Sequence, residues 1–372
     1  MGKLCSIQSG KSDTKDAVPD GPYAFFDRSK TVKRSNRFLR DCEALILPGE
    51  GTEFLPRHHI GKFDLHQRAY ALFDFRPEIS VKFLYYYLHH SADYFPRVAV
   101  GATVKSLRLR HFEDLPVSIT DIKTQHRIVT LLDEAFADIV TAKANAEKNL
   151  QNARELFESQ RQFLLQPKEG WHVATLTDLC NIKHGYAFEG EYFSDSGDHV
   201  LLTPGSFFET GGFRDRGDKT KYFTGPIPTD YVLSQGDLLV AMTEQAAGLL
   251  GSPLLVPESN RFLHNQRLGL VTGKPAVHWT NEFFFHVFNL EAVRKAIHAS
   301  ASGAKVRHTS PGKIGAVQVA FPDNQAEQLR IAAQVEEIEQ ASIALQSIYR
   351  QKLTALDDLK KSLLHQAFSG QL

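Results

Sequence analysis

Several features that often reveal a protein's class are scarce in this 372-residue sequence. Its only cysteines, Cys5, Cys42 and Cys180, are far apart and form no Cys-x-x-Cys pair, which argues against a disulfide framework and against a zinc motif. No apolar run is as long as a membrane span, and the first residues lack the apolar core of a signal peptide. We therefore expect a cytoplasmic protein that does not contact a membrane.

Signatures of catalysis are also missing. Gly10-Lys11-Ser12 is half of a phosphate-binding loop, but the first glycine of that motif is absent, and no Gly-x-Gly-x-x-Gly, His-Glu-x-x-His, Gly-x-Ser-x-Gly or Asn-Pro-Pro occurs. Asp121-Ile122-Lys123 resembles a nuclease Asp-x-Lys, but it stands at a predicted helix start, where Asp is a common cap. We expect no catalytic residue, no bound metal and no cofactor in this chain.

An excess of charge of either sign is the third thing that the sequence lacks. Basic and acidic residues number 43 each, which argues against a protein that coats nucleic acid. A local basic face remains possible, because attraction to phosphate depends on where the charges lie. With 42% hydrophobic and 23% charged residues, the chain is typical of a soluble globular protein with two or three domains.

What the sequence does contain is a duplication. Four motifs recur in the same order, at offsets that rise from 175 to 199, 202 and 203. The later copy therefore has about two dozen extra residues, nearly all before Phe262, and insertions of this kind usually fall in surface loops. The motifs begin at Leu4 and Leu179, at Phe63 and Phe262, at Gly101 and Gly303, and at Gln125 and Gln328.

Each copy has a mixed part followed by a long helical part. Short β-rich runs such as 44–47 and 237–240 are separated by Gly and Pro. An aromatic stretch with helical spacing follows in each copy, at 81–88 and 282–288, and we assign its aromatics to the core rather than to a nucleic-acid surface. The fold class is α+β, with two similar mixed α/β domains.

The helical parts alternate apolar spacings of four and three residues, as in a coiled coil. Each is roughly 40 residues and ~60 Å long. An exposed apolar stripe of that length needs a partner, and the other helix of the chain provides one in an antiparallel pair. The two domains would then be related by a pseudo-two-fold axis. The residues predicted at the seam are Ile128, Leu132, Ile139, Leu156, Ile331, Val335, Leu345, Leu356 and Leu359.

Basic residues concentrate at several places in both domains. Residues 28–40 contain six cations and no anion, whereas acids intersperse the second cluster, at 214–221. Such clusters are either solvated faces or sites that hold DNA phosphates. The candidate DNA-binding residues are Lys11, Arg28, Lys30, Lys33, Arg34, Arg37, Arg57, Lys62, Arg68, Lys105, Lys183, Arg214, Arg216, Lys219, Lys221, Arg267, Lys305 and Arg307.

One dipeptide, Gln-Arg, is repeated at Gln67-Arg68 and at Gln266-Arg267. Residues that both copies share cannot distinguish two different DNA sequences. These pairs therefore support the fold or contact the DNA backbone, and the sequence does not separate the two roles.

Together these residues give the chain a family likeness. It resembles the specificity subunit of type I restriction–modification systems over essentially its whole length. The segments that carry the resemblance are 125–129, the ending 363–370, the opening of the second domain at 167–171, and segments 49–52 and 61–64. One departure is that Gly170-Trp171 precedes Leu179, whereas nothing comparable precedes Leu4, so the first strand is expected to be short or the start late.

The resemblance implies target-recognition domains at 1–120 and 167–322, each followed by a conserved long helix, at 121–166 and at 323–372 with a C-terminal tail. Each domain would recognise one half of a bipartite site in double-stranded DNA, and the coiled coil would set the spacer. Two modification subunits would carry S-adenosylmethionine and adenine methylation, and two restriction subunits would add cleavage with ATP and Mg. The alternatives are a coiled-coil scaffold that binds only proteins and an enzyme with an unrecognised site.

Overall fold

The computed structural model describes residues 1–244, 248–303 and 306–372. It divides into two compact units, one of Met1–Leu150 with Ser347–Leu372 and the other of Gln151–Gln346. The division cuts across both long helices, so each unit contains one mixed domain and the part of the helix pair next to it. No helix in the described part of the chain is long and apolar enough to cross a membrane.

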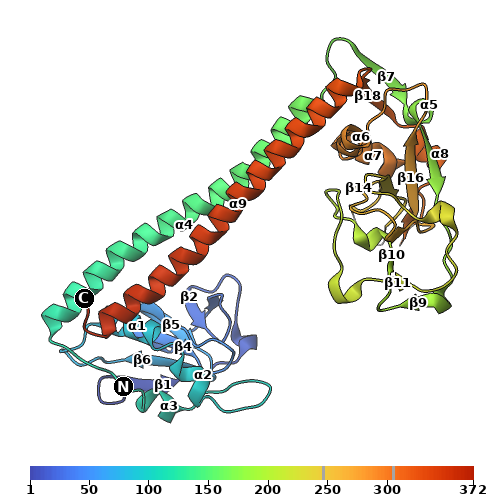
Figure 1. Cartoon of the computed structure of the whole chain (residues 1–372). Helices are drawn as coiled ribbons and strands as arrows, with labels where there is room; N and C mark the ends of the chain where they lie inside the picture. Colours follow the sequence, from blue (N-terminus) through green and yellow to red (C-terminus); the bar gives the residue numbers. More distant parts are fainter. Residues whose placement is uncertain (245–247, 304–305) are drawn as a thin grey trace. The chain divides into compact units, whose positions relative to one another are not determined.

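The first unit is built on a six-stranded sheet with the order β1-β6-β4-β5-β2-β3 (Figure 1). All neighbours are antiparallel except β2 and β5, which are parallel. Its strands are β1 (Ser6–Ser9), β2 (Tyr23–Phe26), β3 (Lys33–Ser35), β4 (Arg40–Pro48), β5 (Arg57–Leu65) and β6 (Ala69–Phe73), and its short helices are α1 (Val81–His90), α2 (Tyr94–Val98) and α3 (Leu109–Glu113).

The second half of β4, residues 44–48, is buried on both faces, as its continuous apolar run predicts. Leu45 and Leu47 point to the core that contains Leu84 of α1, whereas Ile46 packs on the other face with Phe63. The aromatic stretch 81–88 forms α1 and belongs to the core, as predicted.

The second unit contains a broken version of the same sheet. Its two four-stranded sheets have the orders β8-β16-β12-β14 and β15-β10-β11-β9. These orders match the first unit when the single strand β5 is replaced by two short strands, β14 and β15. The strands that correspond to the first unit are β8 (Cys180–His184), β10 (His199–Leu201), β11 (Tyr222–Phe223), β12 (Leu238–Ala241), β14 (Pro253–Leu255), β15 (Phe262–Leu263) and β16 (Leu268–Gly273).

The remaining elements of the second unit surround these sheets. The stretch 282–288, predicted to be core, lies in α6, and Phe283, Phe284 and Phe288 are fully buried there. The other elements are β7 (Trp171–Thr175), α5 (Leu176–Leu179), β9 (Phe193–Ser194), β13 (Thr243–Glu244), α6 (Asn281–Phe288), α7 (Glu291–Ala299), β17 (Arg307–His308), α8 (Pro311–Gly315) and β18 (Gln318–Pro322).

The repeated glycines occupy places where a side chain does not fit. A Cβ on Gly10 would lie 1.9 Å from the carbonyl oxygen of Leu65, and one on Gly185 would lie 2.1 Å from that of Asn265. Both contacts are far inside van der Waals distance, so the chain requires glycine wherever these two segments cross. The duplicated motif therefore preserves a backbone crossing rather than a surface.

The repeated glutamines anchor the two long helices. The Gln125 side chain accepts a hydrogen bond from Ser80 N (2.9 Å) and donates to the carbonyl oxygens of Glu78 and Thr120 (2.9 and 2.8 Å). The Gln328 side chain likewise accepts from Thr280 N (3.0 Å). It donates to the carbonyl oxygens of His278 and Pro322 (2.7 and 2.9 Å). Both glutamines are completely buried.

The long helices, α4 (Ile122–Leu165) and α9 (Gln325–Phe368), pair antiparallel within each unit (Figure 1). In the first unit Ile128 and Leu132 pack with Ala367 and Leu364, and Lys143 forms an ion pair of 2.6 Å with Asp357. In the second unit Ser342 donates to the Ala153 carbonyl oxygen, and Arg154 donates to Gln346. The fold prediction of mixed domains with an antiparallel helix pair is confirmed, and the pseudo-two-fold relation stays a prediction.

The seam follows the predicted register only in part. Ile128, Leu132, Ile139, Ile331 and Val335 are at most 6% exposed, and Leu356 is half-buried. Two predicted seam residues are corrected, because Leu156 and Leu345 are 59% and 39% exposed. Leu359 is 46% exposed but lines one hollow with Ile139 and Leu356.

The physical reason for the correction is a change of spacing along both helices. After Ala153 the inward side chains of α4 are Phe157 and Leu164, and the predicted Leu156 is exposed. A step of four residues where three are expected rotates the apolar stripe, because a straight α-helix has 3.6 residues per turn rather than 3.5. Small residues, Ala146, Ala153 and Ser342, fill the seam near this change.

The two copies also differ at their starts. In the second unit Leu176 N donates a hydrogen bond to the carbonyl oxygen of Val317. In the first unit the Met1 ammonium group donates one to the carbonyl oxygen of Leu115 (2.7 Å). Met1 therefore occupies the place of Leu176, directly after the position of β7. Strand β7 pairs with β18, whereas the corresponding residues 116–120 are assigned to no strand.

Candidate nucleic-acid interface

The repeated Gln-Arg pairs lie at the tip of the same tight turn. Arg68 N donates to His66 Nδ1, and Arg267 N donates to Asn265 Oδ1, both at 3.0 Å. A buried acceptor two residues before the arginine thus closes the turn in each copy and leaves Gln and Arg exposed.

The two arginine side chains at this turn have different surroundings. Arg68 forms an ion pair with the buried carboxylate of Glu50, which also contacts Arg28 at 3.4 Å and accepts a hydrogen bond from Ser106 Oγ. Arg267 forms no ion pair with any residue that the structure describes. Of the two, Arg267 is therefore more available to an external phosphate.

The cations of residues 28–40, which no acid interrupts in the sequence, are largely neutralised by acids from other segments. Lys33 pairs with Asp27 (2.6 Å), Lys30 with Glu53 (2.7 Å), and Arg34 donates to the carbonyl oxygens of Gly21 and Pro22. Burial alone would raise the pKa of Asp27, but hydrogen bonds from Lys33 and Ser29 lower it below its usual value.

Arg57 has a structural position rather than a surface one. It donates to the carbonyl oxygens of Asp27 and Ser29 at 3.1 and 2.8 Å, and its guanidinium group lies over the Phe26 ring. Burial lowers the pKa of Arg57. Its side chain holds the start of the basic segment in place.

The basic cluster of the second domain does converge on one place. Arg214, Arg216, Lys219 and Lys221 line a small cavity of about 50 Å³ together with Thr203 and other residues. Arg214 pairs with Glu209, whereas Arg216 and Lys219 have no acidic partner in the described part of the chain. Cations and hydroxyl groups around one hollow suit a phosphate group.

Exposed aromatic rings accompany several of the predicted lysines, and sequence analysis missed them. Lys62 lies 4.8 Å from the centre of the Phe38 ring, and Lys221 lies 5.5 Å from that of Phe193. Both rings are about 40% exposed, at 44% and 39%. Lys183 lies 4.3 Å from the centre of the Tyr231 ring. In the sequence these aromatic residues stand outside any helical or strand periodicity. That feature alone is only a weak indication that an aromatic ring is exposed.

The remaining candidate cations are dispersed. Lys11 and Lys105 are exposed and pair with no acid among the described residues. Arg307 is half-buried and donates to the His298 carbonyl oxygen at 2.9 Å, which makes it a structural residue. Lys305 lies outside the described residues.

Catalytic chemistry finds little support in the described part of the chain. No group of three or more His, Cys, Asp or Glu residues there is arranged to hold a metal ion. Asp121 caps α4 by accepting hydrogen bonds from Lys123 N and Thr124 N, as its position predicts. Burial raises the pKa of the Cys5 and Cys180 thiols to about 11 and about 12, so neither is an activated nucleophile.

Comparison with known proteins agrees with this architecture. Residues 1–149 match the family model described as the type I restriction modification DNA specificity domain. Two structures share the fold at 14% identity and cover the whole chain. One is a chain from work on complex assembly and conformational transition of the type I R-M system (TM-score 0.72), and the other is the HsdS subunit from Thermoanaerobacter tengcongensis (TM-score 0.62).

Curated relatives point the same way. The chain is 29% identical over 148 residues to the type I restriction enzyme EcoDI specificity subunit of Escherichia coli, a match that covers 40% of this chain and 33% of the relative. It is 25% identical over 222 residues to the EcoBI specificity subunit of Escherichia coli, covering 59% and 43%. A putative type I specificity subunit of Mycoplasma pneumoniae is 26% identical over 211 residues, covering 52% and 56%.

These matches confirm the resemblance to type I specificity subunits that was predicted from the sequence, and the two solved structures share the fold. Its residues 1–149 belong to the type I DNA specificity domain family. The matched regions span about a third to a little over half the length of these curated relatives.

Proposed function

We propose that this chain is a non-catalytic subunit that recognises a specific DNA sequence for a type I restriction–modification complex. The observation that carries the proposal is the division of labour between repeated and diverged residues. Repeated residues, such as Gly10, Gly185, Gln125 and Gln328, build the framework of both domains. Other exposed or half-buried cations and aromatic rings, such as Arg216, Lys219 and Phe38, lie on segments outside the repeated motifs, as expected if each domain recognises its own half of the target.

Phosphate contacts and base contacts would come from different residues. Arg216, Lys219, Arg267, Lys11 and Lys105 are exposed or half-buried and have no acidic partner in the described part of the chain, so we assign them to phosphates. Such contacts would fix the position of the protein on the duplex without distinguishing sequences.

The helix pair would set the spacer and hold the partner subunits. Large apolar side chains remain exposed on both long helices, among them Leu131, Val140 and Leu156 of α4 and Ile343 and Ile348 of α9. Exposed apolar side chains on helices that already have a partner favour a further protein contact. Two modification subunits, which would bind S-adenosylmethionine, fit this position, and two restriction subunits using ATP and Mg would complete the complex.

Single-molecule sequencing of adenine methylation in cells with and without this chain tests the proposal. We expect a motif split into two parts by unspecified bases, which disappears when the chain is removed. Replacing residues 1–120 with the matching domain of a relative should change one half of the motif only. A continuous motif, or methylation that does not depend on this chain, would contradict the proposal and favour a protein scaffold.

A further inference from the structure

One site is polar in the first unit and apolar in the second. The strand registers show the equivalence: Asp64 lies opposite Phe25 of β2, and Leu263 lies opposite Leu201 of β10. By the same registers Ser35 corresponds to Phe223. In the second unit Leu263 and Phe223 belong to one hydrophobic cluster.

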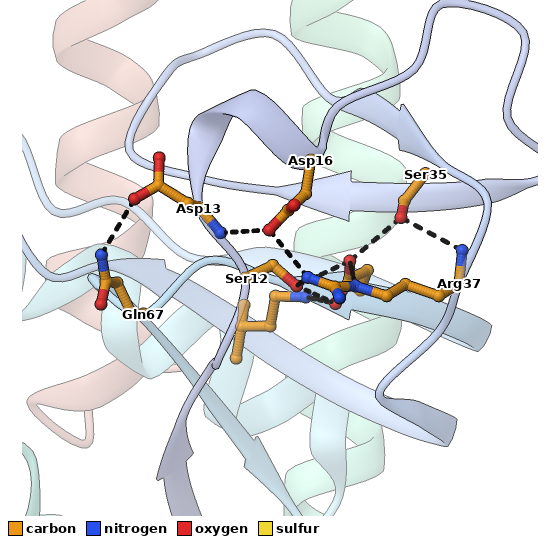
Figure 2. A network of polar contacts seen from close by, with 8 residues as sticks. Ser12, Asp13, Asp16, Ser35, Arg37 and Gln67 are labelled. Carbon is orange, nitrogen blue, oxygen red and sulfur yellow. Dashed lines mark hydrogen bonds and ion pairs between the residues drawn. The ribbon is translucent and has the colours of Figure 1, made fainter.

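In the first unit the site is a network of polar side chains around the carboxylate of Asp64, and Figure 2 labels Ser12, Ser35 and Arg37 of this network. The side chain of Asp64 is only 4% exposed. Its carboxylate accepts hydrogen bonds from Ser12 Oγ (2.7 Å), Ser35 Oγ (3.0 Å) and Leu65 N (2.9 Å). These donors come from the segment after β1, from β3 and from β5, so one carboxylate joins three parts of the domain.

Arg37 attaches to the same network from the surface (Figure 2). Its Nε donates to Asp64 at 3.5 Å, and its Nη2 donates to Ser12 Oγ at 3.0 Å and to Asp16 at 2.7 Å. Arg37 N also donates to Ser35 Oγ (3.2 Å), which fixes the backbone. Yet the Arg37 side chain is 60% exposed, and its Nη1 has no partner among the described residues.

The energetics indicate that this network serves more than stability. A buried carboxylate costs free energy unless it is fully hydrogen-bonded, and replacing buried ionic groups by apolar residues is often neutral or stabilising. The second unit shows that the same fold accommodates such a replacement. We therefore infer that the charged network in the first unit orients the side chain attached to it, that of Arg37.

The arrangement of Arg37 also separates base recognition from phosphate binding. Two carboxylates, those of Asp16 and Asp64, offset the charge of the guanidinium group and weaken its attraction to phosphate. The N–H groups of Nη1 keep their direction, and a side chain that is already fixed loses little entropy on binding. A rigid, neutralised donor suits a base edge in the major groove.

We propose that Asp64 is a positioning residue that holds Arg37 in the orientation in which Arg37 contacts a base edge of the half-site bound by the first domain. The inference rests on the proposed function. It assigns base recognition in the first domain to a residue that has no polar counterpart in the second, where the equivalent site is closed by Phe223 and Leu263.

The test uses the full chain in complex with its modification subunits and a duplex DNA library with randomised positions. The variants Asp64→Asn and Arg37→Lys should relax selection at the same position of one half of the motif, by about tenfold or more, and leave the other half unchanged. Lys30→Met is the matched control, because Lys30 is an exposed cation of the same segment outside the network. It should leave the selected motif unchanged at every position.

Two outcomes would overturn the inference while the proposed function stands: a motif that neither variant changes, or one that Arg37→Lys changes and Asp64→Asn does not. A wild-type complex that selects no motif would overturn both. If the Asp64→Asn variant is too unstable to fold, the same selection experiment is carried out with Asp16→Ala. Asp16 is the more exposed of the two carboxylates that Arg37 contacts. Asp16→Ala should relax the same position, and an unchanged motif would again refute the inference.

Discussion

Replacing Gln125 by methionine should destabilise the first unit while leaving the second unit intact. Methionine has a similar length, but it neither accepts from Ser80 N nor donates to the carbonyl oxygens of Glu78 and Thr120. Each buried backbone group left without a partner costs about 1–3 kcal/mol. With three such groups, partly relieved by local relaxation, we expect a loss of roughly 3–5 kcal/mol.

Two measurements follow this loss. In a domain of 150–250 residues each kcal/mol lowers the melting temperature by about 2–4 °C, so the transition of the first unit should fall by roughly 10 °C. Native-state hydrogen exchange of the Ser80 amide should accelerate, and exchange of the Thr280 amide, which Gln328 protects, should not. The Gln328→Met variant should show the reverse pattern.

His126→Ala serves as the control, because His126 is the next residue on the helix and is exposed. It should change the melting temperature by little. If Gln125→Met melts like His126→Ala, or if the Ser80 amide exchanges at the wild-type rate, the repeated glutamines are not helix anchors and the reasoning is wrong.

Three further outcomes are expected. In denaturant unfolding, Ile139→Ala should lower the free energy of unfolding by roughly 2–4 kcal/mol, because Ile139 is only 6% exposed. Leu156→Ala should lower it by less than about 1 kcal/mol, because Leu156 is 59% exposed. Equal losses for the two variants would refute the corrected seam. Fusing the sequence of Trp171–Thr175 ahead of Met1 should add a strand beside residues 116–120, as β7 lies beside β18, and raise the melting temperature. A fusion with its apolar residues changed to serine should not raise it. Burial lowers the pKa of His286 from 6.5 to about 4. As the pH falls, the unfolded state therefore binds a proton on this histidine before the folded state does. About 3 kcal/mol of the free energy of unfolding should be lost between pH 6.5 and 4. His286→Gln should flatten that pH dependence in thermal unfolding, and an unchanged slope would show that His286 does not cause it.

The two copies differ in ways that leave their common framework unchanged. The framework contacts of Gln125 and Gln328 are nearly identical, whereas Asp64 has become Leu263 and the single strand β5 has become β14 and β15. Changes of that kind leave the sheet order intact, because each alters a local site and not the crossing of segments at Gly10 or Gly185. Local sites can therefore differ in one domain while the framework of both domains is kept.

Much of the architecture could be predicted from the sequence because it depends on local and periodic signals. The order of the repeated motifs predicts the duplication and the two mixed domains. The spacing of apolar and aromatic residues predicts the aromatic core helices and the long helices. The cap formed by Asp121 follows from its place before a helical pattern. Two of the segments that carry the family resemblance, 61–64 and 125–129, overlap the repeated motifs, and Gln125 in the second of them is part of the framework.

The tertiary structure alone decided which charges remain available. The run of cations at 28–40 contains no acid, but Asp16, Asp64, Glu50 and Glu53 approach it from elsewhere in the chain. It also decided where the seam rotates, because 3.5 and 3.6 residues per turn diverge over a 44-residue helix. Composition and periodicity depend on the order of residues along the chain. Ion pairs and packing depend on which distant residues folding brings into contact, and this the order alone does not reveal.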